Sequence, residues 1–255
     1  MKIRHASAAL LLLFAVGACN DSTTTPAPTT TSPSGSRITG PPTIGLVPGT
    51  GSTSDALAKL RTAPAAPMTG YSRAQFGAAW TDKVTVDGGG NGCDTRNDIL
   101  RRDLVGITTK PGTSGCVVAT GTLHDPYTGH TIVYTRGPKS SVVQIDHMVP
   151  LGDAWKTGAA GLTAAVRTNL ANDPLNLDAV DGPTNEAKGD ADAASWLPPT
   201  TVYRCEYVAR QIAVKSRYKL WVTPGERAAL ATVLGSCPGL PLPTGSDTAV
   251  PSPTG

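Results

Sequence analysis

The stretch Val142–Leu151, VVQIDHMVPL, has the composition of a buried strand but contains two polar residues at its centre. Most of its side chains are apolar and typical of a protein core. Asp146 and His147 are not, and successive residues of a strand point to opposite faces of a sheet, so a single wet face cannot take both. An acid and an imidazole inside an apolar strand therefore indicate a chemical role.

The segments around this strand predict an α+β domain. Further β-prone runs lie at 116–123, 131–136 and 175–180, and the turn signal Asp125–Gly129 separates the first two. Helical patterns alternate with these runs. We predict helices at 70–80 with Ser72 as N-cap, at 93–104, at 154–170, from Asn185 with Thr184 as cap, at 202–218 with a solvated basic face, and from the capping box Thr223–Glu226 to Leu234.

Both ends of the 255-residue chain differ in composition from its middle. Residues 1–18 have the basic start and short apolar run of a secretory signal, and the run is too short to span a bilayer. VGAC at 16–19 resembles the site where lipoprotein signals are cut before a lipidated cysteine, Cys19; ordinary cleavage nearby is the alternative. We expect a disordered Thr-, Pro- and Ser-rich tether at 19–54, one domain at 55–240, and a disordered tail at 241–255.

Four further cysteines lie in the predicted domain: Cys93, Cys116, Cys205 and Cys237. An even number in an exported chain indicates two disulfides, and three pairings are possible. We favour Cys93–Cys116 with Cys205–Cys237, because each pair brackets one compact segment. A zinc ion bound by all four cysteines is the alternative, but the sequence has no C-x2-C spacing.

The formal net charge of the chain is +3 at pH 7. This net charge is too small to indicate nucleic-acid binding by itself, so a phosphate-binding surface requires local clustering of cations. Arg96 and Arg136 are candidates for phosphate contacts. Salt bridges with Asp94, Asp98 or Asp103 are the competing interpretation of these two arginines.

Chemically capable side chains follow two of the predicted strands. Asp146 and His147 lie in VVQIDHMVPL, and Asn185 and Lys188 lie three residues apart after strand 175–180, where one helix face can present both. A carboxylate and an amide oxygen suit a hard divalent cation. An imidazole beside that ion can take the proton from an attacking water, so the set can hydrolyse a phosphodiester.

Three segments carry a family resemblance: IDHMVPL at 145–151, NLDAV at 176–180 and TNEAKGD at 184–190. In this order they resemble the HNH endonucleases of the ββα-metal fold, and most closely the GmrSD-type HNH domain of exported bacterial proteins. DPYTG, SWLPP and YRCEYVARQIAVKSRY extend the resemblance to about residues 93–237. We therefore expect an α+β fold with a ββα-metal (HNH) core, additional helices, two disulfides and a disordered N-terminal tether.

The resemblance implies roles for individual residues. His147 is expected to be the general base, and Asp146 and Asn185 the metal ligands, with Asn185 in the place of the final histidine of the family name. Asn176 is expected to fix the loop between strand and helix by hydrogen bonds. Lys188 would meet the scissile phosphate.

Structural alternatives exist for these residues. Asn172 competes with Asn176 for the loop-fixing role. An Asp-His pair at a strand end can be a buried hydrogen-bonded pair, Asn185 alone a helix cap, and Lys188 alone a solvated side chain. The order of these residues along the chain favours the catalytic interpretation. A zinc hydrolase is disfavoured because no H-E-x2-H helix is present.

We predict a metal-dependent endonuclease that hydrolyses phosphodiester bonds of DNA, in preference to RNA, outside the cytoplasm. One divalent ion is expected, Mg²⁺ in preference to Mn²⁺. Nucleic acid is the expected partner, contact with a membrane is expected only through a lipid anchor at Cys19, and no protein partner is implied. The protein is expected to be lipid-anchored at the cell membrane or secreted. The alternative function is a surface-anchored nucleic-acid- or partner-binding module that keeps the fold without turnover.

Overall fold

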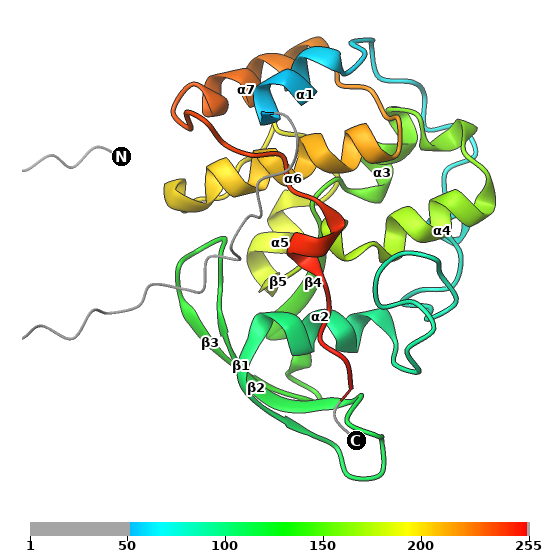
Figure 1. The fold of residues 1–255 in the computed structure, drawn as a ribbon, viewed down its shortest axis with the longest axis vertical. Coiled ribbons are helices and arrows are strands. Elements are labelled where there is room, and N and C mark those ends of the chain that lie inside the picture. The colour runs from blue at the N-terminus through cyan, green and yellow to red at the C-terminus, as the bar shows by residue number, and fades with distance from the viewer. Residues whose placement is uncertain (1–51, 254–255) are drawn as a thin grey trace, which may run out of the picture. The chain divides into compact units, whose positions relative to one another are not determined.

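The computed structural model describes residues 52–253 (Figure 1). The predicted signal at 1–18, Cys19 and nearly all of the tether at 19–54 lie outside the described residues. No helix in the described part is both long and apolar enough to cross a membrane. In sequence order the elements are α1 (Thr53–Lys59), η1 (Arg73–Phe76), α2 (Thr95–Asp103), β1 (Leu104–Thr109), β2 (Val118–His124), β3 (Thr131–Thr135), η2 (Ser140–Val142), β4 (Val143–His147), α3 (Leu151–Lys156), η3 (Ala159–Gly161), α4 (Ala164–Asn172), η4 (Pro174–Asn176), β5 (Leu177–Asp181), α5 (Gly182–Lys188), η5 (Thr201–Tyr203), α6 (Arg204–Arg217), α7 (Pro224–Leu234) and η6 (Gly245–Thr248).

Two antiparallel sheets organise the strands of this α+β fold. β1, β2 and β3 form one sheet in that order, and β4 pairs with β5 in the other. The register of the second sheet places Asp146 opposite Asp178 and His147 opposite Leu177. β1 differs from the sequence-based prediction, which continues the preceding helix to Leu104. The β-branched residues after Leu104 favour a strand, and β2 supplies its pairing partner.

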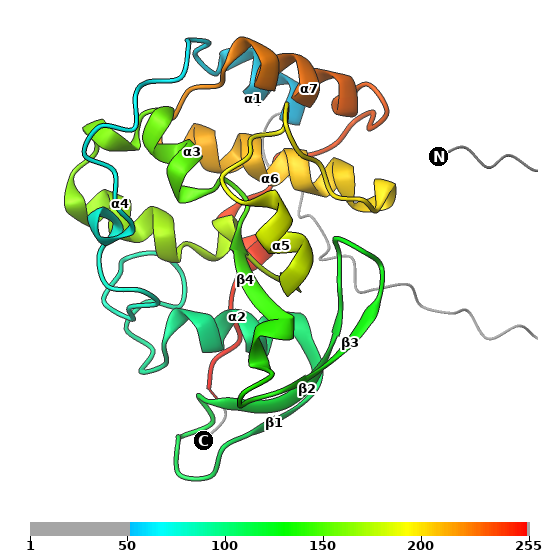
Figure 2. The same ribbon diagram turned by 180° about the vertical axis from the view of Figure 1, so that it is seen from behind.

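The second sheet and α5 form the ββα core. A helical insertion separates β4 from β5, and α5 follows β5 directly, so that it lies beside both strands (Figure 1 and, from behind, Figure 2). The single helix predicted at 154–170 is divided into α3 and α4. The break includes Gly158, whose φ of +132° is a backbone conformation that favours glycine. Asp181, rather than Thr184, caps α5, because its carboxylate accepts a hydrogen bond from the Thr184 backbone N–H.

α1, the first helix of the described residues, and α7, near the C-terminus, both pack against α6 (Figure 1). The predicted capping box of Thr223 and Glu226 is present at the start of α7. The prediction of a solvated basic face on α6 is wrong, because Arg210 and Lys215 are buried. Arg210 pairs with Asp178 at 2.9 Å. Buried cations require such partners, and this partner comes from β5, which is distant in the sequence.

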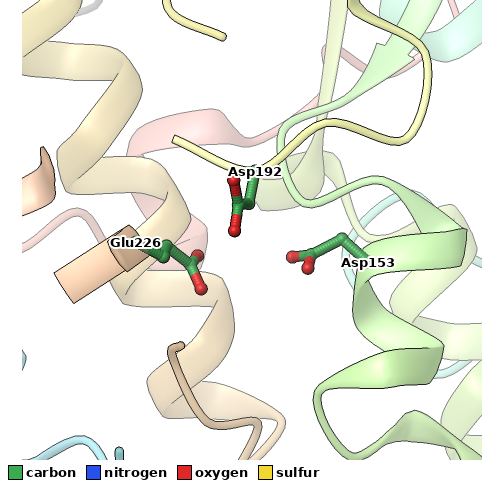
Figure 3. A group of neighbouring side chains, drawn as sticks. All are labelled: Asp153, Asp192 and Glu226. Carbon is green, nitrogen blue, oxygen red and sulfur yellow. The ribbon is translucent and has the colours of Figure 1, made fainter. Parts of the chain in front are cut away.

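Three carboxylates that are distant in the sequence lie close together, and two of them pair with Lys215. One oxygen from each of Asp153, Asp192 and Glu226 lies within 4.8 Å of the others, and Figure 3 shows the three side chains pointing toward one another. The Lys215 ammonium lies 2.9 Å from Asp153 and 2.7 Å from Glu226. Burial raises the pKa of Glu226 to about 7, and attraction to Lys215 opposes that increase. The lysine therefore supplies the positive charge that a metal ion would otherwise bring.

Two disulfides are present, Cys93–Cys116 and Cys205–Cys237, with Cα–Cα distances of 5.2 and 5.9 Å. These are the pairings that the sequence favours, and a zinc site made of the four thiolates is therefore not formed. The first disulfide joins the start of α2 to the segment before β2. The second joins α6 to the segment that follows α7.

Replacing Cys205 and Cys237 together by alanine should lower the free energy of unfolding by about 2–4 kcal/mol. The two residues are 32 positions apart, and the bond restricts a loop of that length in the unfolded chain. Thermal unfolding followed by circular dichroism measures the loss as a lower Tm. The Cys93→Ala/Cys116→Ala variant, with a separation of 23, should lose slightly less. Unchanged Tm values in both variants would contradict the expected stabilisation.

The folded part extends beyond the composition-based boundaries at both ends. α1 begins at Thr53, inside the segment 19–54 that was predicted as a tether. Residues 241–253, predicted as part of a disordered tail, also differ from that expectation, because they pack against the domain. For example, the Pro251 carbonyl accepts a hydrogen bond from Arg101 at 2.7 Å. The tail makes such contacts through its backbone carbonyls, so they cannot be predicted from the Pro- and Thr-rich composition of its side chains.

Candidate active site

His147 is the last residue of β4 and is buried. Its Nε2 lies 3.0 Å from the carbonyl oxygen of Ala171 in α4. A carbonyl oxygen only accepts hydrogen bonds, so Nε2 carries the proton and the neutral ring keeps Nδ1 as an unprotonated acceptor. The same hydrogen bond fixes the orientation of the ring. The tautomer that a general base acting through Nδ1 requires is therefore set by α4.

The imidazole of His147 is neutral at neutral pH. Burial lowers its pKa to about 3; the Ala171 carbonyl opposes this decrease, whereas the positive charges of Arg73 and Lys188 add to it. Trp80 stacks on the ring with a centroid separation of 5.9 Å and an interplanar angle of 13°. A ring that is neutral and fixed in position can accept a proton.

Asp146, the preceding residue, has one carboxylate oxygen bound by two donors. The Lys188 Nζ lies 2.7 Å from Oδ2, and the Tyr127 hydroxyl donates a hydrogen bond to the same oxygen. Burial, together with the charge of Asp146, raises the pKa of Tyr127 well above its usual value, so the hydroxyl keeps its proton. The two donors orient the carboxylate and leave Oδ1, which accepts no hydrogen bond from residues 52–253, for another ligand.

Lys188 does not lie where the sequence predicted it. Its side chain is buried, and Nζ donates to Asp146 and, at 2.7 Å, to the backbone carbonyl of His147. The ammonium therefore points into the protein and is not placed to meet a substrate phosphate. The physical reason is the burial of Asp146: an unpaired charge there would cost several kcal/mol, roughly 3–5 by comparison with other buried pairs, and α5 brings Lys188 to it.

Asp146, His147 and Asn185 line one cavity of about 240 Å³, as the sequence predicted for these three residues. Asn185 lies on α5 and donates through Nδ2 to the Gln144 side chain at 2.9 Å. The amide is thereby oriented, and its carbonyl oxygen remains available as a ligand. The ββα core thus brings the carboxylate, the imidazole and the amide to the same cavity.

Two further charged residues, Asp190 and Arg73, line this cavity. Asp190 accepts a hydrogen bond from the backbone N–H of Gly152 at 3.2 Å. A Cβ at Gly152 would lie 2.5 Å from the Asp190 carboxylate, so glycine permits this close approach. Arg73 is exposed and belongs to η1, a short 3₁₀ turn where the sequence predicted a helix over 70–80. Sequence reasoning assigned neither residue to the site. Asp190 ends the TNEAKGD segment but was given no role, and no spacing rule links Arg73 to the motif.

Asn176 fixes the loop that follows β4. It is fully buried; its Oδ1 accepts from the Val149 backbone N–H at 2.8 Å, and its Nδ2 donates to the Leu170 carbonyl at 3.2 Å. One amide therefore joins the end of β4 to α4, which is the structural role that the resemblance implies. Asn172, the competing candidate, donates instead to the Thr168 carbonyl within α4.

The two arginines proposed for phosphate binding do not line the cavity. Arg96 donates to the Val143 carbonyl at 3.3 Å, and Arg136 donates to the Val118 carbonyl at 2.6 Å. Neither makes a salt bridge with the nearby aspartates, which was the alternative interpretation; Arg101 and Arg102 make those pairs. Arg96 and Arg136 therefore secure strands of the two sheets.

The oxygen donors of the cavity fit a hard divalent cation. Asp146 and Asp190 provide carboxylates, and Asn185 provides an amide carbonyl. Such a set, without a thiolate, suits Mg²⁺ or Mn²⁺ better than a soft metal. His147 lines the same cavity, so a candidate base lies beside these candidate ligands.

A strand pair followed by a helix, with an Asp-His pair at the end of the first strand, defines the class of HNH-type nucleases. Within that class, the chain belongs to the family "GmrSD restriction endonucleases, C-terminal domain", whose model matches residues 94–233. An uncharacterized secreted protein of Arthroderma benhamiae is 39% identical over 198 residues, which are 77% of this chain and 90% of that protein. No solved structure shows a significant similarity to the chain.

Proposed function

We propose that this protein is a metal-dependent endonuclease that hydrolyses phosphodiester bonds of nucleic acid, DNA in preference to RNA. The observation that carries the proposal is one cavity that joins Asp146, Asn185 and a neutral His147 whose Nδ1 is unprotonated. Membership in a restriction-endonuclease family supports nuclease chemistry at the level of the class.

His147 acts as the general base of the proposed reaction. Its Nε2 keeps a proton through the hydrogen bond to Ala171, so Nδ1 takes the proton of a water that attacks the phosphorus. The resulting imidazolium still donates to the Ala171 carbonyl, which offsets part of the burial and of the Arg73 and Lys188 charges that disfavour the charged ring. The base therefore needs no change of tautomer or ring orientation during the step.

Asp146 and Asn185 would bind the divalent ion, Mg²⁺ in preference to Mn²⁺, and Asp190 lies in the wall of the same cavity. When bound, the ion screens the negative charge that develops on the phosphate and on the leaving oxygen. Lys188 and Tyr127 orient Asp146 through its Oδ2 before any ligand arrives.

Cleavage assays on supercoiled plasmid and on circular single-stranded DNA test the proposal. The purified protein with Mg²⁺ or Mn²⁺ should nick or linearise the DNA, and EDTA should abolish cleavage. The alternative function, a binding module without turnover, predicts DNA retention in a gel shift and intact DNA under both conditions. That outcome would remove the proposed activity.

Asp146→Ala and Asn185→Ala should each weaken metal binding, and excess Mg²⁺ should partly restore their activity. The loss of affinity should exceed the ~10–100-fold that is typical when a residue supporting a ligand is removed. Activity titrated against Mg²⁺ concentration measures the shift. Asp87→Ala is the matched control, because Asp87 is an exposed carboxylate that does not line the cavity and, within the described residues, accepts only from the remote Val250 backbone N–H. Identical Mg²⁺ requirements in all three variants would contradict the ligand assignment.

We also propose that the domain works outside the cytoplasm. Disulfides persist in oxidising compartments, and the chain has two. The similar protein of Arthroderma benhamiae is described as secreted. A lipid anchor at Cys19 is proposed from the sequence alone.

A further inference from the structure

A second cavity adjoins the first beside His147. Its volume is about 210 Å³, and Arg73, His147 and Leu151 line both cavities. The rest of its wall is mostly apolar and comes from residues 74–80 and from the end of α4. Two adjoining cavities of this kind fit a ligand that is charged at one end and planar and apolar at the other.

A buried amide in the second cavity has an unused acceptor. Asn172 is 2% exposed and its Nδ2 donates to the Thr168 carbonyl, whereas its Oδ1 has no hydrogen-bond partner within residues 52–253. Buried carbonyl oxygens in proteins normally have a partner. The loop-fixing role belongs to Asn176, so it does not account for Asn172. Asn172 lines the second cavity, and a rotation of its amide toward the cavity would let Oδ1 accept a hydrogen bond from a ligand N–H.

Trp80 provides an aromatic wall with a strained backbone. Its φ is +56°, a conformation that bulky residues rarely adopt. Strain of this kind concentrates at ligand and active sites, and Trp80 stacks on His147. Trp80 and Arg73 both lie before residues 94–233, the part of the chain that the family model matches.

We propose that the second cavity binds an unpaired nucleobase next to the scissile phosphate. Arg73 contacts that phosphate, and Asn172 Oδ1 accepts a hydrogen bond from an exocyclic amino group of the base. An apolar cavity of about 150 Å³ holds benzene, so this one has room for a planar ring. Stacking on aromatic side chains and hydrogen bonds to base edges are how proteins recognise unpaired bases.

The preferred substrate class is therefore single-stranded nucleic acid, or an unpaired nucleotide in a longer duplex. A base inside a duplex is stacked and paired, and it enters such a cavity only after it has left the helix. This inference rests on the proposed nuclease function, because that function places the phosphate beside His147. The experiments below measure binding without turnover, so that the two can fail separately.

The first experiment compares two strands with the same number of phosphates. Fluorescence anisotropy in EDTA measures the affinity of the full chain for a short labelled DNA strand and for an abasic strand of equal length. The strand with bases should bind about fivefold to 150-fold more tightly, which corresponds to the ~1–3 kcal/mol of one stacked base. Equal affinities would overturn the proposal.

A cavity-filling variant locates the base contact. Ala78→Leu/Ala79→Leu narrows the second cavity and should remove the preference for the strand with bases. The control Ala228→Leu/Ala231→Leu adds the same groups to exposed positions of α7 and should keep the preference. Circular dichroism checks that both variants are folded. A folded cavity variant that keeps the full preference would place the base elsewhere and would overturn the proposal.

Asn172→Leu tests the acceptor. Cytosine carries an amino group where thymine carries a carbonyl oxygen, so the wild-type protein should bind oligo(dC) more tightly than oligo(dT). Asn172→Leu should bind the two equally, because its side chain has no acceptor. Absence of a cytosine preference in the wild-type protein, or its persistence in Asn172→Leu, would overturn the assignment of Asn172.

Arg73→Ala tests the phosphate contact. It should weaken binding to the normal and the abasic strand by the same factor and reduce the slope of log affinity against log salt by about 0.7. Lys59→Ala, an exposed lysine of α1 that lines neither cavity, should leave the slope unchanged. A preference for the strand with bases, without any cleavage, would support the base-binding cavity and refute the proposed nuclease function. Cleavage without such a preference would support the nuclease function and refute the base-binding cavity.

Discussion

His147→Ala should reduce the rate of DNA cleavage by about 10²–10⁴-fold, the usual contribution of general-base catalysis. The hydrogen bond from Nε2 to the Ala171 carbonyl keeps the other ring nitrogen, Nδ1, unprotonated and able to accept a proton. Asp146 keeps its own partners, Lys188 and Tyr127, in the variant. The rate at saturating Mg²⁺ should therefore fall while the Mg²⁺ concentration at half activity stays nearly constant.

His130→Ala is the matched control for this experiment. His130 is exposed in the turn between β2 and β3, so its removal should leave the cleavage rate unchanged. His147→Ala also removes the stacking partner of Trp80, and circular dichroism must show that the variant is folded. If folded His147→Ala cleaves at the unmutated rate, the Asp-His pair is structural and the proposed mechanism is wrong.

Lys215→Met should lower the free energy of unfolding by about 3–5 kcal/mol, the range found when one partner of a buried ion pair is removed. Lys215 is completely buried, and it is the cation between Asp153 and Glu226. Methionine preserves most of the side-chain volume but leaves these carboxylates without a positive partner. Chemical denaturation compared with the wild-type protein measures the difference.

The pH dependence of this loss provides a second test. In Lys215→Met, Glu226 loses an attraction that opposes the effect of burial, so its folded-state pKa should rise further above the present value of about 7. The folded state then binds a proton that the unfolded state, with an ordinary glutamate pKa, does not bind. The variant should therefore regain stability as the pH falls below that raised pKa. Lys59→Met, at an exposed position of α1, should change stability little at any pH. Equal stability of Lys215→Met and Lys59→Met would contradict the structural role of the cluster.

Local patterns determine much of the ββα core. The apolar run around Asp146 and the alternation at 175–180 follow from side-chain pattern, and the helix that holds Asn185 follows from the turn and cap signals before it. The structure confirms their order. The capping box at Thr223 is confirmed for the same reason, because its hydrogen bonds join residues three positions apart. Family resemblance, rather than periodicity, assigned roles to the individual residues of the site.

The predicted and observed elements differ where the local sequence signals are weaker. The helix predicted over 93–104 ends at Asp103, and the β-branched residues that follow pair with β2 as a strand that was not predicted. The helix expected over 70–80 is reduced to one 3₁₀ turn, and this segment lies against His147 and α4 instead. At 70–80, tertiary contacts outweigh a small helical propensity.

The sequence by itself determined the class of fold, the order of the core elements and the Asp146–His147 pair, because these depend on residues that are close along the chain. Only the tertiary structure decided which cation lines the cavity beside Asp146 and His147. Lys188 has the spacing that the motif requires. However, the buried carboxylate of Asp146 needs a positive partner, and the Lys188 ammonium pairs with it instead of facing the cavity. Arg73 has no spacing relation to the motif and lines the cavity because its segment folds back over β4 and α4. Charge pairing acts through space, so separation along the chain does not reveal it.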